Sequence, residues 1–124
     1  MEKNKIYKWK IKIIKTKAYD IEIGVTNIDF DINLSSPSKY GWYFYCFDST
    51  LYSGPPHNYR GKSTEFKKNK NEIIVIMDMN KGSLKFIVDN EDKGESYTNI
   101  PINNSLAPSI LLYNINDSVE IMEC

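Results

Sequence analysis

Apolar and polar side chains alternate near the start of this chain with a period of two residues. Between positions 7 and 13 every second residue is apolar and lysines stand between them, in the order Tyr7, Lys8, Trp9, Lys10, Ile11, Lys12, Ile13. Successive side chains of a β-strand point to opposite faces, so residues 7–14 are predicted to form a strand with one buried and one solvated face. Trp9 is therefore expected in the core.

Similar segments recur along the rest of the chain. Ile21, Ile23 and Val25 keep the same spacing around Gly24, whose missing side chain suggests a bulge or a group that lies close. The remaining predicted strands are mostly apolar and span 41–47, 72–79, 84–88, 106–113 and 119–122. The β-branched segment 72–79 is typical of a strand that is covered on both faces.

No stretch has the 3.6-residue period of an amphipathic helix, and Gly, Pro, Asn and Asp interrupt the chain about every ten residues. This pattern favours an antiparallel all-β sandwich. A chain of 124 residues has the length of one domain around one core, so residues 1–124 are expected to fold as a single domain. Function is expected in two irregular segments, 26–40 and 53–70.

Several residue types indicate structural roles. Trp9 and Trp42 are expected as core residues, because an indole buries a large apolar area. Cys46 is expected to be a small buried apolar residue. Asp78 ends an apolar strand and is expected to accept N–H bonds from the following turn, in which Gly82 supplies a positive φ.

The charge balance argues against two classes of partner. Sixteen Lys and Arg residues balance sixteen Asp and Glu residues, so the formal net charge is zero. A neutral chain lacks long-range attraction for nucleic acid or an anionic membrane surface, and neither partner is expected. Seven of the first seventeen residues are lysines, which are expected to protect an exposed sheet edge from unwanted pairing.

The chain shows no signal-peptide segment and no apolar run long enough for a membrane span, so a cytoplasmic or nuclear location is expected. His57 is the only histidine, and Cys46 and Cys124 are the only cysteines. Zinc sites need three or four ligands, so no metal and no cofactor are expected. Glu72, Asp78, Glu120 and Glu123 are the candidate catalytic carboxylates. No spacing pairs them, and an enzyme is not expected.

A series of short motifs follows one order along almost the whole chain. The motifs are Tyr7–Ile13, Ile23-Gly24-Val25, Gly41-Trp42, Leu51-Tyr52-Ser53-Gly54, Ile74–Phe86, Gly94, Ile100-Pro101, Leu106–Ile110 and Val119-Glu120-Ile121. In this order they resemble the SPRY domain, a β-sandwich of the concanavalin-like jelly-roll type. Many SPRY domains have further strands before the first motif, whereas six residues precede Tyr7. The chain therefore resembles a minimal version, or else another segment or chain covers the edge that those strands would occupy.

The resemblance implies a non-catalytic protein-interaction module or adaptor that recognises a short peptide or a protein surface through loops at one end of the sandwich. In SPRY domains that capture Asn-rich peptides, two aromatic residues line the pocket, and Tyr52 and Tyr113 occupy the matching positions. Tyr113 stands where Trp is commoner, and Asn114 follows where Gly is usual. Tyr52, Tyr113 and Asn114 are therefore implied as partner contacts.

The loop 53–61 carries the other candidate contacts. Pro and Gly fix its path, while His57, Tyr59 and Arg60 offer donors and stacking faces. Arg60 is the only arginine, and its planar guanidinium suits a carboxylate or a pair of backbone carbonyls. The alternative for Arg60 is a surface salt bridge, and the alternative for Tyr113 is a cap on the sandwich.

A carbohydrate-binding, lectin-like sandwich is the alternative function, because Asn, Asp and aromatic side chains in loops also suit sugars. Asp78-x-Asn80-x-Gly82 matches part of a calcium loop, but the third acidic position and the terminal Glu are missing. No feature of the sequence indicates an oligomeric state.

Overall fold

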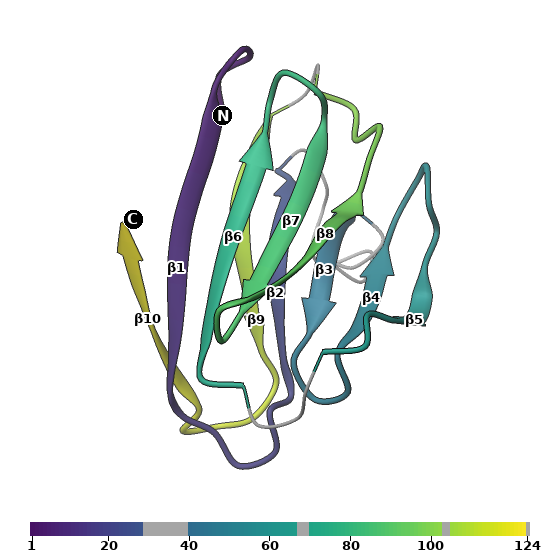
Figure 1. Ribbon diagram of the computed structural model, residues 1–124. Coiled ribbons are helices and arrows are strands. Elements are labelled where there is room, and N and C mark those ends of the chain that lie inside the picture. The colour runs from purple at the N-terminus through teal and green to yellow at the C-terminus, as the bar shows by residue number, and fades with distance from the viewer. Residues whose placement is uncertain (29–39, 67–69, 103–104, 124) are drawn as a thin grey trace.

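The computed structural model describes residues 1–28, 40–66, 70–102 and 105–123, and it places them in two five-stranded antiparallel sheets (Figure 1). Sheet A has the order β10-β1-β6-β7-β8, and sheet B has the order β5-β4-β3-β2-β9. The strands are β1 (Ile6–Lys15), β2 (Ile21–Asn27), β3 (Gly41–Tyr45), β4 (Thr50–Ser53), β5 (Arg60–Ser63), β6 (Glu72–Asp78), β7 (Ser83–Val88), β8 (Glu91–Tyr97), β9 (Leu106–Leu112) and β10 (Ser118–Glu123). The predicted antiparallel β-sandwich is confirmed.

The two sheets bury alternate residues against each other. In β6, for example, Ile73, Val75 and Met77 are fully buried, while the residues between them are only partly covered. The shared core includes Trp9, Ile11, Ile21, Ile23, Val25, Trp42, Phe44, Cys46, Leu51, Ile73, Val75, Met77, Leu84, Phe86 and Val88. Each large apolar side chain of this kind stabilises the fold by about 1.5–3 kcal/mol through burial. The predicted core positions of Trp9, Trp42 and Cys46 are confirmed.

Two expectations about strand environment are wrong. Strand β1 is an interior strand, paired with β10 on one side and β6 on the other, so its lysines do not guard a sheet edge. Instead they cover the outer face of sheet A, where Lys10 forms an ion pair with Glu72 at 3.4 Å. Strand β6 is buried on one face only, because no layer of described residues lies outside sheet A.

The turn between β6 and β7 forms as its residues predict. Asp78 Oδ1 accepts the backbone N–H groups of Asn80 at 2.8 Å and Lys81 at 3.2 Å. Gly82 adopts a φ of +68°. Gly24 allows a close approach and not a bulge: a Cβ there would lie 1.9 Å from the Trp42 carbonyl oxygen, and the β2–β3 register is continuous.

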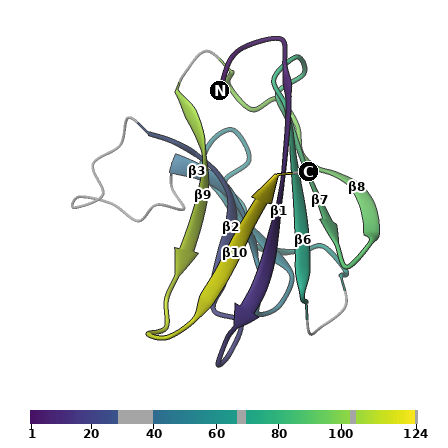
Figure 2. The same cartoon turned by 90° about the vertical axis from the view of Figure 1, so that its left-hand side faces the viewer.

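The end strands of the two sheets leave one side of the sandwich open. Strand β10 ends sheet A and strand β9 ends sheet B, and the view in Figure 2 looks toward both. Within the described ranges no helix is long and apolar enough to cross a membrane.

Candidate functional site

Alternation along β3 divides its aromatic residues between the two faces of sheet B. Trp42 and Phe44 enter the core, whereas Tyr43 and Tyr45 point to the outer face. The strand register places Tyr45 beside Glu22 of β2, and Tyr43 beside Tyr52 of β4. The outer face of sheet B therefore carries tyrosines next to a carboxylate.

Tyr113 joins this surface from the residue after β9. Its hydroxyl donates a 2.5 Å hydrogen bond to Glu22 Oε2, and its backbone N–H donates to the Asp20 carbonyl at 3.2 Å. The Tyr45 hydroxyl donates to Asp20 Oδ1 at 2.6 Å. These two O–H···carboxylate bonds connect the end of β9, the start of β2 and the end of β3.

Burial governs the protonation of this surface. Glu22 is only 5% exposed, and desolvation raises the pKa of its carboxyl although the Tyr113 hydroxyl opposes the change. Desolvation and the bond to Glu22 raise the pKa of Tyr113, and desolvation and the bond to Asp20 raise that of Tyr45. Both phenols therefore stay protonated as donors at neutral pH.

Tyr52 and Arg60 extend the same face toward β5. The Tyr52 ring lies 5.7 Å from the Tyr45 ring in an edge-to-face arrangement, and Arg60 pairs with Tyr52 across the β4–β5 ladder. Arg60 Nη1 donates to the carbonyl oxygens of Ser53 and, at 3.0 Å, Tyr59. The guanidinium thus engages a pair of backbone carbonyls, but they belong to its own chain. We call the surface of Asp20, Glu22, Tyr45, Tyr52, Arg60 and Tyr113 the tyrosine face.

His57 and Tyr59 belong to a different cluster. Their rings stack at 4.9 Å, and both lie 5.6 Å from the ring of Tyr97. His57 Nε2 lies 2.7 Å from the Thr98 carbonyl oxygen, and Tyr97 donates to the backbone carbonyls of Tyr43 and Tyr52. This stack connects the loop between β4 and β5 to sheet A.

The predicted contacts lie at opposite ends of the sandwich. Tyr113 and Asn114 follow the end of β9, where β2 begins and β3 ends, whereas His57 lies beyond the other end of β3 and β4 (Figure 1). Asn114 begins a turn in which its carbonyl accepts the Asp117 N–H at 3.3 Å. Tyr52, Arg60 and Tyr113 therefore share one surface, which His57 and Tyr59 do not join. The irregular segment 26–40 lies largely outside the described residues.

The candidate catalytic carboxylates have separate environments. Asp78 is bonded to its own turn, Glu72 is paired with Lys10, and Glu123 lies opposite Trp9 near the end of β10. Among the described residues, no group of three or more His, Cys, Asp or Glu side chains is arranged to hold a metal ion.

Sequence reasoning missed Asp20, Glu22 and Tyr45. The alternation of Glu22 with Ile21 and Ile23 places it opposite the core, and Tyr45 alternates with Phe44 in the same way. This signal identifies the outer face but not which strands lie side by side on it. The adjacency of β2, β3 and β9 is a property of the folded chain.

Solved structures resemble this fold over nearly the whole chain. The SPRY domain of human HERC1 matches with a TM-score of 0.71 and 18% sequence identity, covering 98% of this chain and 77% of that one. The PSpry domain of TRIM65 matches with a TM-score of 0.64 and 14% identity, covering 99% of this chain and 64% of that one.

This chain thus spans less than two thirds of the TRIM65 structure. No protein-family model and no curated protein sequence matches it. The structural likeness confirms the SPRY fold that the motif order predicted.

Proposed function

We propose that this SPRY-fold chain is a non-catalytic protein-interaction module that recognises a short peptide or a protein surface through the tyrosine face. The observation that carries the proposal is the position of Tyr113. Its side chain is 52% exposed, yet its hydroxyl is fixed by the buried Glu22 carboxylate. The ring is therefore held in one orientation while a large part of its surface is available to a partner.

The chemistry of the tyrosine face suits a protein ligand. A tyrosine ring offers a large rigid contact area at low entropic cost, which is why tyrosines are enriched among residues that dominate binding energy. Phe47, 59% exposed and 5.9 Å from the Tyr45 ring, enlarges the apolar area. The Asp20 carboxylate, which is partly exposed, offers acceptor capacity for backbone N–H groups or a basic side chain.

Two screens run in parallel test this function against carbohydrate binding. The full chain is presented to a random displayed peptide library and to a glycan array, and hits are titrated against Tyr113→Ala and Ile115→Ala. Ile115 is the matched control, because it is 91% exposed and lies two residues away in the β9–β10 turn. We expect peptide hits whose affinity falls at least about tenfold in Tyr113→Ala and stays unchanged in Ile115→Ala.

Tyr113→Phe separates the ring from the hydroxyl. It retains the contact area but loses the bond to Glu22, so peptide affinity should fall by less than in Tyr113→Ala. Glycan hits that depend on Tyr113, with no peptide hit, would replace the proposal by the lectin-like alternative. Peptide hits that bind both alanine variants equally would remove the tyrosine face as the binding surface.

A further inference from the structure

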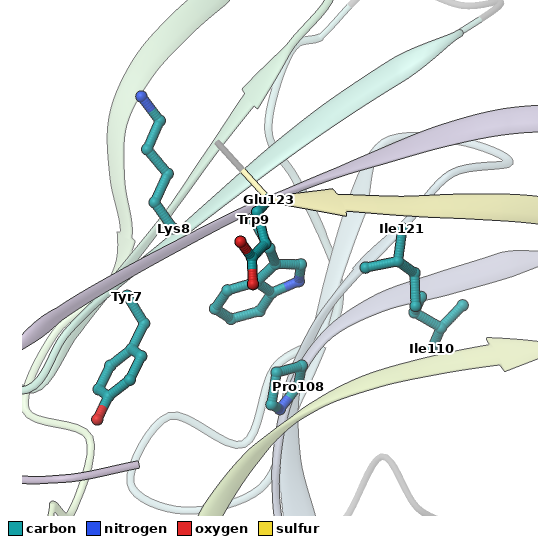
Figure 3. Close-up of a pocket in the computed structure, with 7 residues that line it drawn as sticks. All are labelled: Tyr7, Lys8, Trp9, Pro108, Ile110, Ile121 and Glu123. Carbon is teal, nitrogen blue, oxygen red and sulfur yellow. The ribbon is translucent and has the colours of Figure 1, made fainter.

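A groove runs along the open side of the sandwich, between the end strands of the two sheets. Its volume is about 480 Å³, and its lining residues are Tyr7, Lys8, Trp9, Pro108, Ile110, Ile121 and Glu123. Figure 3 shows these side chains, with the Trp9 ring between Pro108 of β9 and Glu123 of β10. The groove is separate from the tyrosine face, because its lining residues other than Lys8 belong to the inner faces of the sheets.

The groove continues the apolar core, but its side chains are not fully covered by other described residues. Ile121 lies opposite Ile11 in the β1–β10 register, and both side chains point toward sheet B. Ile11 is fully buried, whereas Ile121 is 63% exposed. On the other wall, Pro108 and Ile110 lie opposite the buried residues Val25 and Ile23. An apolar side chain bound in the groove would bury the exposed residues of both walls.

The backbone indicates the shape of that occupant. Within the described ranges, β10 pairs only with β1, and β9 pairs only with β2. Each strand therefore presents one row of N–H and C=O groups without a strand partner. An extended peptide satisfies such an edge, and its alternate side chains would enter an apolar groove beside it.

The charges indicate one feature of its sequence. In Figure 3 the Glu123 carboxylate lies over the groove beside Trp9, whereas the Lys8 side chain points away. No ion pair joins Glu123 to another residue in the described part of the chain. A basic side chain on the occupant would complement this carboxylate at the rim of the apolar groove.

We propose that the groove between β9 and β10 binds an extended segment of another protein as an added strand along β10. Apolar side chains at alternate positions of that segment fill the space between Ile110 and Ile121, and a basic side chain faces Glu123. This interface is additional to the tyrosine face and does not depend on it.

The test uses the full chain and peptides selected from a random displayed library. Selected peptides are synthesised and titrated into ¹⁵N-labelled native protein, Ile121→Asp and Ile115→Asp. Ile121→Asp puts a charge in the groove at an exposed position, while Ile115→Asp makes the same change outside it. We expect a class of peptides with alternating apolar residues whose affinity falls at least tenfold only in Ile121→Asp.

Two further readouts separate groove binding from a general loss of binding. The indole N–H resonance of Trp9 should shift on titration, and backbone amides of 118–123 should exchange more slowly with solvent in the complex. Glu123→Lys should weaken the same peptides, chiefly those with a basic residue, by several fold.

Three results would overturn the proposal. The first is a library that yields no peptide sensitive to Ile121→Asp, including the case in which all hits depend on Tyr113 alone and support only the tyrosine face. The second is peptide binding without any shift of the Trp9 indole resonance. The third is a dimer of this chain, observed by sedimentation, that Ile121→Asp dissociates, because a second copy would then be the occupant.

Discussion

Glu22 is a buried carboxylate that accepts a hydrogen bond from a tyrosine hydroxyl. Its carboxylate is 5% exposed on the outer face of sheet B, and the Tyr113 hydroxyl bonds to it. Removing a carboxylate from water disfavours its charged form, so desolvation raises its pKa despite this bond. The residue that positions Tyr113 therefore also opposes folding at neutral pH.

Replacing Glu22 by Gln should stabilise the protein in a pH-dependent way. The raised pKa means that folded Glu22 keeps a proton that the unfolded chain releases above its ordinary value of 4.5. Its contribution to stability is present below that value and is lost as the pH rises through the folded pKa. Glu22→Gln keeps an acceptor for Tyr113. The difference in unfolding temperature between Glu22→Gln and the native protein should therefore shift in favour of Glu22→Gln as the pH rises from 4 to 7.

Thermal unfolding at both pH values measures this difference. Glu120→Gln, at an exposed position of β10, is the control and should show no such trend. A constant offset between Glu22→Gln and native across the range would contradict the desolvation argument.

The resemblance and the chemistry of the loop 53–61 predicted part of the tyrosine face. Tyr52 and Tyr113 come from motif positions, and the structure places them on one surface with Arg60. His57 and Tyr59 were predicted from their loop chemistry alone. The structure stacks them on Tyr97, where contact between the aromatic rings stabilises their positions. Their role as partner contacts stays a prediction.

The turn between β6 and β7 shows how an element depends on a glycine. Gly82 has a positive φ, and its carbonyl accepts the Ile100 N–H at 2.8 Å. A Cβ at this position would lie 2.4 Å from the Ile100 carbonyl oxygen. The segment after β8 therefore lies directly against the turn, and both backbones would have to shift to admit a side chain.

Two alanine variants separate the effect of the positive φ from the effect of the clash with Ile100. Gly94 also has a positive φ, of +87°, but a Cβ there meets nothing within 4 Å. Gly94→Ala should lower the free energy of unfolding by about 1–2 kcal/mol through the backbone conformation alone. Gly82→Ala should lose at least about 1 kcal/mol more, because it adds the clash with Ile100. Urea denaturation of both variants measures the difference, and equal losses would show that the clash is relieved at no cost.

Strands with a clear apolar face could be predicted from the sequence, and polar end strands could not. The predicted strands 7–14, 72–79 and 84–88 correspond to β1, β6 and β7 within about one residue at each end. Strand β5 is Arg-Gly-Lys-Ser and strand β8 is Glu-Asp-Lys-Gly-Glu-Ser-Tyr, so neither has the alternation of a half-buried strand. Both end a sheet, where backbone pairing to one neighbour forms a strand with little side-chain burial.

The whole molecule combines one core, open along the side between β9 and β10, with two separate surfaces of different chemistry. The tyrosine face presents phenol hydroxyls and carboxylates on the outer side of sheet B, and the groove presents apolar side chains between β9 and β10. Each surface depends on strands that are distant in sequence, such as β2 with β9 or β1 with β10. This is the physical reason why local patterns predicted the layers but not the surfaces. A location in the cytoplasm or nucleus stays a prediction.

Amide chemical-shift mapping tests the tyrosine face most directly. The ¹⁵N-labelled chain is titrated with a peptide selected for sensitivity to Tyr113→Ala, and shifted amides are placed on the two sheets. We predict that the shifted amides lie in 20–22, 43–45, 50–52 and 111–114, and that the resonances of sheet A stay unchanged. Shifts confined to sheet A, or to the His57–Tyr59 stack at the opposite end of the sandwich, would contradict this prediction.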